Sequence, residues 1–143
     1  GLRVDFPGGW EGDEIDLFTA EGREAQAYNT DGLKVEKGQA ADLFNYVSRL
    51  FQWRKTADVI HNGKTMHFMT RDNTYAYFRY NDEAAVFVYI NNNLEPVNVP
   101  WSYYSEITEG LQGGVDVLTG EPVEISDATV VAPKTALVVE FNR

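Results

Sequence analysis

The stretch YAYFRYNDEAAVFVYI, residues 75–90, decides the fold of this chain. It contains two runs, 75–80 and 84–90, that are rich in aromatic and β-branched residues. The polar sequence Asn-Asp-Glu at residues 81–83 separates them and has the composition of a turn. Such runs, bounded by turn residues, predict two short β-strands.

Further short strands are predicted on both sides of this stretch. The runs with a period of two are 66–70, 97–99, 115–118, 123–125, 129–131 and 136–141. Turn-forming residues, such as the Thr-Gly-Glu-Pro of residues 119–122, separate them. Short strands at this spacing predict an antiparallel β-sandwich or barrel.

A helical period precedes the strands. Between residues 39 and 55, apolar side chains recur at intervals of three and four, which predicts an amphipathic helix. Its apolar arc covers about half the circumference, wider than the stripe of ~100° that a helix on one core needs. Tyr46 and Trp53 lie along one edge of this arc, and Phe44 and Phe51 along the other. We therefore expect the helix to contact two neighbours.

Composition excludes several classes of protein. The chain has 143 residues, enough for one domain or one domain with part of another, and its 43% hydrophobic content indicates a folded protein. A net charge of −10 disfavours nucleic acid and anionic membranes as partners. The absence of cysteine excludes disulfides, thiolate metal sites and cysteine nucleophiles. The longest apolar run, residues 84–90, is too short for membrane insertion.

Residues 1–38 predict a long irregular segment, because Gly, Asn and Asp recur in turn-forming combinations. Four carboxylates cluster there: Glu11, Asp13, Glu14 and Asp16. Catalytic carboxylates need burial that separates their pKa values. This spacing offers none, so we interpret the cluster as a solvated acidic loop.

The sequence predicts no metal site and no cofactor. Residues 27–38 can be aligned with the calcium-loop pattern, but Ala27 and Gly38 stand where its two anchoring carboxylates belong. His61 and His67 are the only histidines, and no third ligand stands at a zinc-binding spacing.

Aromatic residues offer candidate ligand-binding surfaces. Phe6 and Trp10 lie on a stiff Pro-Gly-Gly turn and would either stack on a sugar or plug the rim of a barrel. Strand alternation would send Trp101 and Tyr103 to one face, as a glycan platform or as half of a core.

Four groups of segments, in order along the chain, resemble one known family. They are RVDFPGGW (3–10) with FTAEGR (18–23), LFQWRK (50–55) followed by Asn62-Gly63, YAYFRY (75–80) with VFVYINN (86–92), and DVLTGE (116–121). These segments are similar in sequence to the end of the catalytic barrel and to the carboxy-terminal domain of the alpha-amylase family of glycoside hydrolases. Within that family it is closest to the neopullulanase and cyclomaltodextrinase branch.

This resemblance implies a domain organisation. Residues 1–56 would be the last part of a catalytic (β/α)8 barrel, with a rim loop at 1–38 and its last helix at 39–55. Residues 57–143 would be a Greek-key antiparallel β-sandwich of the amylase C-terminal type. The parent protein would hydrolyse α-1,4 or α-1,6 links of starch or maltodextrin with two carboxylates and retention of configuration. None of the family's catalytic carboxylate motifs occurs here, so we expect no catalytic residue and no activity in this chain.

The resemblance also implies sites and partners. Arg3, Asp5 and Trp10 match the rim loop near the family's active-site mouth, and with Trp101 and Tyr103 they are the candidate substrate-binding residues. Expected partners are the parent's own barrel, α-glucan oligosaccharides bound weakly, and a second copy paired through helix 39–55. The resemblance is compatible with calcium in the parent, and a looser calcium site of oxygen ligands in the first loop stays open, but no residue here supports either. A periplasmic or secreted parent is compatible with the sequence.

Two rival interpretations stay open at this point. A stand-alone carbohydrate-binding module accounts for the 13% aromatic content but not for the helix before the strands. A small intact hydrolase would have to use the acidic loop, which offers no oriented base.

Overall fold

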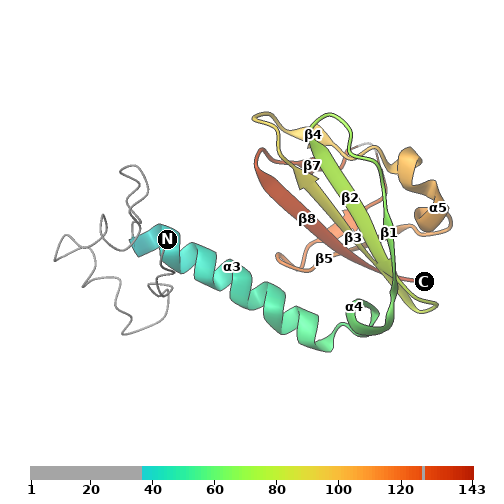
Figure 1. Cartoon of the computed structure of the whole chain (residues 1–143), viewed down its shortest axis with the longest axis horizontal. Helices are drawn as coiled ribbons and strands as arrows, with labels where there is room; N and C mark the ends of the chain where they lie inside the picture. Colours follow the sequence, from blue (N-terminus) through green and yellow to red (C-terminus); the bar gives the residue numbers. More distant parts are fainter. Residues whose placement is uncertain (1–36, 127) are drawn as a thin grey trace. The chain divides into compact units, whose positions relative to one another are not determined.

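The computed structural model describes residues 37–126 and 128–143, with side chains from residue 45 onward (Figure 1). The chain divides into two units, Gly1–Gln52 and Trp53–Arg143, and the division falls inside the long helix α3 (Lys37–Thr56). This helix confirms the one predicted for residues 39–55. The predicted rim loop lies outside the described residues, apart from its last two positions.

A short second helix, α4 (Asp58–Asn62), follows α3 and was not expected. Ala57 between them has an extended backbone, which ends α3, and its N–H still donates to the Trp53 carbonyl at 3.1 Å. Five residues are too few to show a helical period, so this helix leaves no signal in the sequence. Gly63 ends it where a Cβ would overlap the Val59 carbonyl oxygen and lie 2.9 Å from that of Tyr80.

Six strands form one antiparallel sheet in the order β1-β2-β3-β8-β5-β6. Their bounds are β1 (Lys64–His67), β2 (Thr74–Tyr80), β3 (Ala84–Asn91), β5 (Gly113–Asp116), β6 (Pro122–Glu124) and β8 (Thr135–Asn142). The last strand, β8, therefore lies between β3 and β5, as Figure 1 shows. Strands β2 and β3 are the pair predicted from residues 75–90.

The inner face of this sheet carries the main core. On β2, Ala76 and Phe78 are buried while Tyr75 and Tyr77 between them are partly exposed, which is the alternation expected of a strand with one covered face. The largest buried side chains of the core cluster are Phe78, Phe87, Tyr89, Trp101, Tyr104 and Phe141. Strand β3 is buried on both faces, because Val86 and Phe87 are both fully buried.

A smaller second layer covers this core. It consists of the two-stranded ribbon of β4 (Val97–Asn98) and β7 (Val130–Val131), a 3-10 helix η1 (Trp101–Tyr104), and α5 (Ser105–Thr108). The predicted fold class, mainly antiparallel β with few helices, is confirmed. The second layer is built as much from helical turns as from strands.

One local prediction is wrong: residues 101–103 form a 3-10 helix and not a strand. Pro100 precedes them and has no N–H to donate to a ladder, and the Tyr103 N–H donates back to its carbonyl at 2.9 Å. The Trp101 indole N–H donates to Thr129 Oγ1 at 3.0 Å. These bonds turn the chain over the core, so no strand alternation applies there.

Candidate functional site

The outer face of the sheet, opposite the main core, holds a second apolar cluster at one end. Val59 of α4 is 2% exposed and packs with Val86 of β3 and Val138 of β8, also buried. Trp53, from the last turn of α3, and Ile60 pack against the same cluster. We call the contacts of residues 53–62 with this face the helix–sheet junction.

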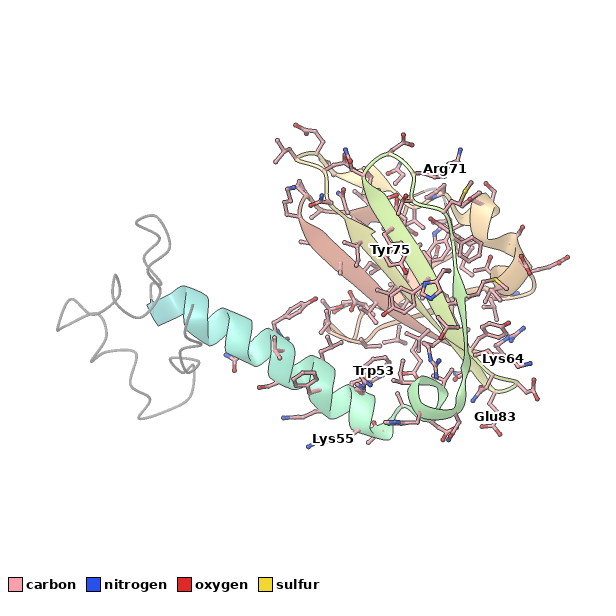
Figure 2. All side chains as sticks on the ribbon, viewed as in Figure 1. Trp53, Lys55, Lys64, Arg71, Tyr75 and Glu83 are labelled. Atoms are coloured by element: carbon pink, nitrogen blue, oxygen red, sulfur yellow. The ribbon has the colours of Figure 1, made fainter. Side chains whose placement is uncertain are left out.

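Polar bonds fix the junction in register. The Trp53 indole N–H donates to the Glu140 carboxylate of β8 at 2.9 Å. The Arg79 guanidinium of β2 donates to the Ile60 carbonyl at 2.7 Å through one nitrogen and to Thr65 Oγ1 at 2.7 Å through another. The end of α3, the whole of α4 and three strands are thus tied together. Figure 2 shows Trp53 at this end of the sheet, with Arg71 at the other.

The Arg79 side chain also carries a buried group without a partner. Its Nε atom is enclosed and has no hydrogen bond to any residue that the structure describes. An unpaired buried N–H costs free energy. The Nε atom therefore does not hold Arg79 in place, and the hydrogen bonds of its two terminal nitrogens do. It acts as a strut between α4 and β1.

The phenol of Tyr77 stands on the same face as Arg79. Burial is the main cause that raises the pKa of Tyr77, and the neighbouring Tyr75 raises it further, while Arg54 and Arg79 oppose the shift. Tyr77 is therefore a neutral phenol at physiological pH.

The candidate substrate-binding residues fall into two groups. Arg3, Asp5 and Trp10 lie outside the described residues. Trp101 is 4% exposed and packs against Phe87, with ring centroids 4.8 Å apart, which matches the core alternative stated for it. Tyr103 is half-buried, and its ring lies 4.7 Å from the Arg71 guanidinium. Binding roles for these residues stay predictions, and the burial of Trp101 counts against one for its ring.

Across residues 37–126 and 128–143, no cluster of three or more His, Asp or Glu side chains could hold a metal ion. In the same part of the chain, no helix combines the length and apolarity needed to cross a membrane.

Two junction residues were missed by sequence reasoning, although each left a signal. Glu140 interrupts the apolar run of β8, and Arg79 interrupts the aromatic run of β2. A charged residue inside an otherwise apolar strand marks a position where that strand meets a polar partner. Here the partners are an indole N–H and a helix carbonyl.

Comparisons with known proteins identify the family of this domain and structures with a similar fold. The family profile of the cyclo-malto-dextrinase C-terminal domain matches residues 65–140, more than half of the chain. The fold is similar to that of AmyP in complex with maltose, at 22% identity and a TM-score of 0.58, over 77% of this chain and 22% of that one.

An alpha-amylase from Anoxybacillus is similar at 16% identity and a TM-score of 0.58, over 83% of this chain and 28% of that one. The alpha-amylase from Geobacillus thermoleovorans, complexed with acarbose, is similar at 16% identity and a TM-score of 0.55, over 80% of this chain and 25% of that one. The present chain thus spans about a quarter of the length of these proteins. At such identities the likeness shows the fold, and the family profile shows the family. The chain belongs to the cyclo-malto-dextrinase C-terminal domain family.

Proposed function

We propose that this chain is the non-catalytic C-terminal part of a starch- or maltodextrin-degrading hydrolase of the neopullulanase or cyclomaltodextrinase type. Its role is to cap and stabilise the catalytic barrel that precedes it in the parent protein. The observation that carries the proposal is the helix–sheet junction. The last turn of α3 is hydrogen-bonded to a central strand on the outer face of the sheet. If α3 is the last helix of a barrel, this contact attaches the barrel to the sheet.

The strength of the junction supports this role. Fully burying a side chain such as Val59 contributes about 1.5–3 kcal/mol, and the indole–carboxylate bond of Trp53 adds about 1.5 kcal/mol or more. Pulling α3 off the sheet would expose this cluster and leave Glu140 without its donor. A barrel that ends in this helix would gain stability from a folded domain at its end.

The length of the solved relatives agrees with this proposal. The present chain corresponds to about a quarter of each, which leaves room for a (β/α)8 barrel of ~250 residues before it. A stand-alone binding module is not favoured, because the family profile that matches belongs to a C-terminal domain.

The test is made in the full-length hydrolase. We expect Trp53→Ala to lower the Tm of the whole enzyme by several degrees and to leave kcat at 25 °C within about twofold, because the change weakens a scaffold contact. Lys55→Ala, an exposed position in the same helical turn, is the matched control and should change neither quantity. A fall in kcat at unchanged Tm would contradict the proposal and place Trp53 in the catalytic machinery.

The chain by itself should be inactive. Incubated with starch, pullulan or cyclodextrins, it is expected to release no reducing sugar, because the carboxylate motifs of the family are missing from its sequence. Turnover that disappears in Asp13→Ala would revive the small-hydrolase interpretation instead.

A further inference from the structure

Beyond the junction, the outer face of the sheet carries a cluster of three aromatic rings. They are His67 of β1 and Tyr75 and Tyr77 of β2, with ring centroids 5.8–6.1 Å apart. His67 is exposed and both tyrosines are partly exposed, so solvent reaches all three. We call this cluster the ring platform. Tyr75 lies four residues along β2 from Arg79, roughly 13 Å, which separates it from the junction.

Two of these rings form one nearly flat strip. The Tyr75 hydroxyl and His67 Nδ1 are hydrogen-bonded at 2.5 Å, and the two ring planes differ by 15°. The hydroxyl lies on the long axis of its ring and Nδ1 on the rim of the imidazole. A centroid separation of 6.1 Å across this bond therefore places the rings almost end to end. The strip is held by its own hydrogen bond before any ligand arrives.

The third ring bends the surface. Tyr77 is tilted by 36° from Tyr75 and by 40° from His67. Two phenols and an imidazole line the platform, and burial raises the pKa of Tyr77, which keeps that phenol uncharged. The surface is thus apolar on its ring faces and curved across its width.

A hollow of about 350 Å³ lies beside the platform and shares Tyr75 with it. This volume falls at the lower end of the range for small-molecule sites. Ile90, which pairs with Tyr75 across the strands, forms the apolar part of the wall. The polar part includes Arg71, Asp72, Asn73 and Asn92. Figure 2 shows Tyr75 on the sheet between Arg71 and Trp53.

The polar groups of the hollow are oriented by their neighbours. Lys134 Nζ donates to both the backbone carbonyl and Oδ1 of Asn92, at 2.7 and 3.0 Å, which fixes the carboxamide and leaves its NH2 group available. Asn93 Nδ2 donates to the Asp72 carbonyl at 2.8 Å and holds that loop. The Asp72 carboxylate has no hydrogen bond to any other described residue, so it remains an acceptor.

These features select a neutral, hydroxyl-rich ligand. The C–H face of a pyranose packs on an aromatic face, whose partial negative charge attracts the C–H groups, while the sugar hydroxyls donate to a carboxylate and accept from an amide. Arg71 also lines the hollow, but its guanidinium lies over the Tyr103 ring, 4.7 Å from the ring centroid, so an anion in the hollow would meet Asp72 and a chain of net charge −10. A wholly apolar partner would leave Asp72 and Asn92 without hydrogen bonds, at a cost in free energy.

We propose that the ring platform and the adjacent hollow form a glucan-binding site. One glucose unit stacks on the strip of His67 and Tyr75, and the next enters the hollow and bonds Asp72 and Asn92. The preference for an α-1,4-glucan over a β-1,4-glucan comes from the proposed function. The choice of glucose as the sugar rests on the proposed function, whereas the site itself does not.

The test is a titration of the 143-residue chain with maltoheptaose, followed by backbone NMR shifts, with cellohexaose in parallel. We expect shifts centred on residues 67, 75, 77 and 92 and a Kd of about 1 mM, since a few stacked rings in an open site bind no more tightly. His67→Ala and Tyr75→Ala should each weaken binding at least fivefold. Tyr75→Phe keeps the ring and should weaken it less, which guards against misreading a folding defect in Tyr75→Ala.

Met69→Ala is the matched control, because Met69 is 80% exposed in the neighbouring loop and does not line the hollow. No shifts with about 10 mM maltoheptaose would overturn the site. Shifts centred on Tyr103 would overturn its position, and equal binding of cellohexaose would overturn the preference for α-1,4 links. None of these outcomes affects the capping role, which is measured by the Tm of the whole hydrolase.

Discussion

Asn91, at the end of β3, joins the two layers of the domain through a single side chain. It is 1% exposed, and its Nδ2 donates to three backbone carbonyls, those of Glu95, Val131 and Ala132, at 2.9–3.1 Å. Its Oδ1 accepts from the backbone N–H of Asn93 at 2.9 Å. One carboxamide thus bonds backbone groups of β7, of the residue after β7 and of the loop after β3.

We expect Asn91→Ala to lower the free energy of unfolding by about 2–4 kcal/mol, because it removes the donor from one buried and two part-buried carbonyls. Urea unfolding followed by tryptophan fluorescence measures this change. Asn98→Ala, at an exposed position of β4, should stay within about 0.5 kcal/mol of the wild type. Equal effects of the two substitutions would show that the Asn91 network contributes nothing specific.

Tyr104 makes the free energy of unfolding depend on pH in the alkaline range. Its ring is 4% exposed and packs edge-on to Phe68 with centroids 4.9 Å apart. Burial is the main cause that raises the pKa of Tyr104 far above its ordinary value, with the neighbouring Tyr89 and Tyr103 adding to it and Arg71 opposing it. Because the folded state holds the phenol neutral, its contribution is complete below the unfolded pKa of about 10 and is lost as pH rises beyond that value.

The free energy of unfolding should therefore be level from about pH 7 to 9 and should fall above about pH 10. Tyr104→Phe keeps the ring and removes the titrating group, so its decline above pH 10 should be shallower. Urea unfolding at a series of pH values measures both slopes. If the two slopes coincide, other groups carry the pH dependence.

At the scale of elements, β5 comes so close to β8 that only glycine fits. A Cβ on Gly114 would overlap the Glu140 carbonyl oxygen and lie 2.7 Å from Phe141 Cδ1 and 2.8 Å from Val139 Cγ1. Gly113, one residue earlier, would place a Cβ 2.8 Å from the Val123 carbonyl oxygen of β6. The backbone of β5 packs where a side chain would otherwise stand.

Gly114→Ala is expected to destabilise the domain by about 1–3 kcal/mol, because β5 must move away from β8 to admit the methyl group. Hydrogen exchange should then quicken in β5 and β6 before the other strands. Val115→Ala in the same strand, where Val115 is 48% exposed, should cost under about 1 kcal/mol. Unchanged stability in Gly114→Ala would mean that the strand gives way without cost.

Sequence reasoning located most elements and could not order them. Runs rich in aromatic and β-branched residues, bounded by turn residues, made β2, β3 and β8 predictable. The pairing of β8 with β3 was not, because turn residues report only local connections. Helix α4 and the 3-10 turn at Trp101 were missed because short helical segments carry no period. The ring platform depends on His67 lying opposite Tyr77 in the β1–β2 register, which no single run reveals.

At the scale of the whole molecule, helix α3 presents apolar side chains on two edges. Trp53 packs against the outer face of the sheet, whereas Phe51 is 57% exposed. The side chain of Phe44 lies outside the described residues. We predict that two copies pair through this second edge, because each exposed apolar side chain would gain about 1.5–3 kcal/mol on burial.

Sedimentation equilibrium of the 143-residue chain tests the pairing. We expect a dimer for the wild type and a monomer for the double variant Phe44→Glu, Phe51→Glu, since two charges on this edge oppose burial. Gln52→Glu, exposed in the same turn, should leave the dimer intact. A folded wild type that sediments as a monomer would rule the pairing out.

The central place of β8 also governs the order of events at the ribosome. Strands β3 and β5 flank β8 in the sheet. Until residues 135–142 emerge from the exit tunnel, the strand that pairs with both of them is missing. Every strand from β1 to β7 is synthesised before that, and the nascent chain carries the open edges of β3 and β5, which are prone to aberrant pairing. A ribosome stalled before Thr135 would thus hold a chain whose strands are nearly all made but whose sheet cannot close, a substrate for chaperones or proteases.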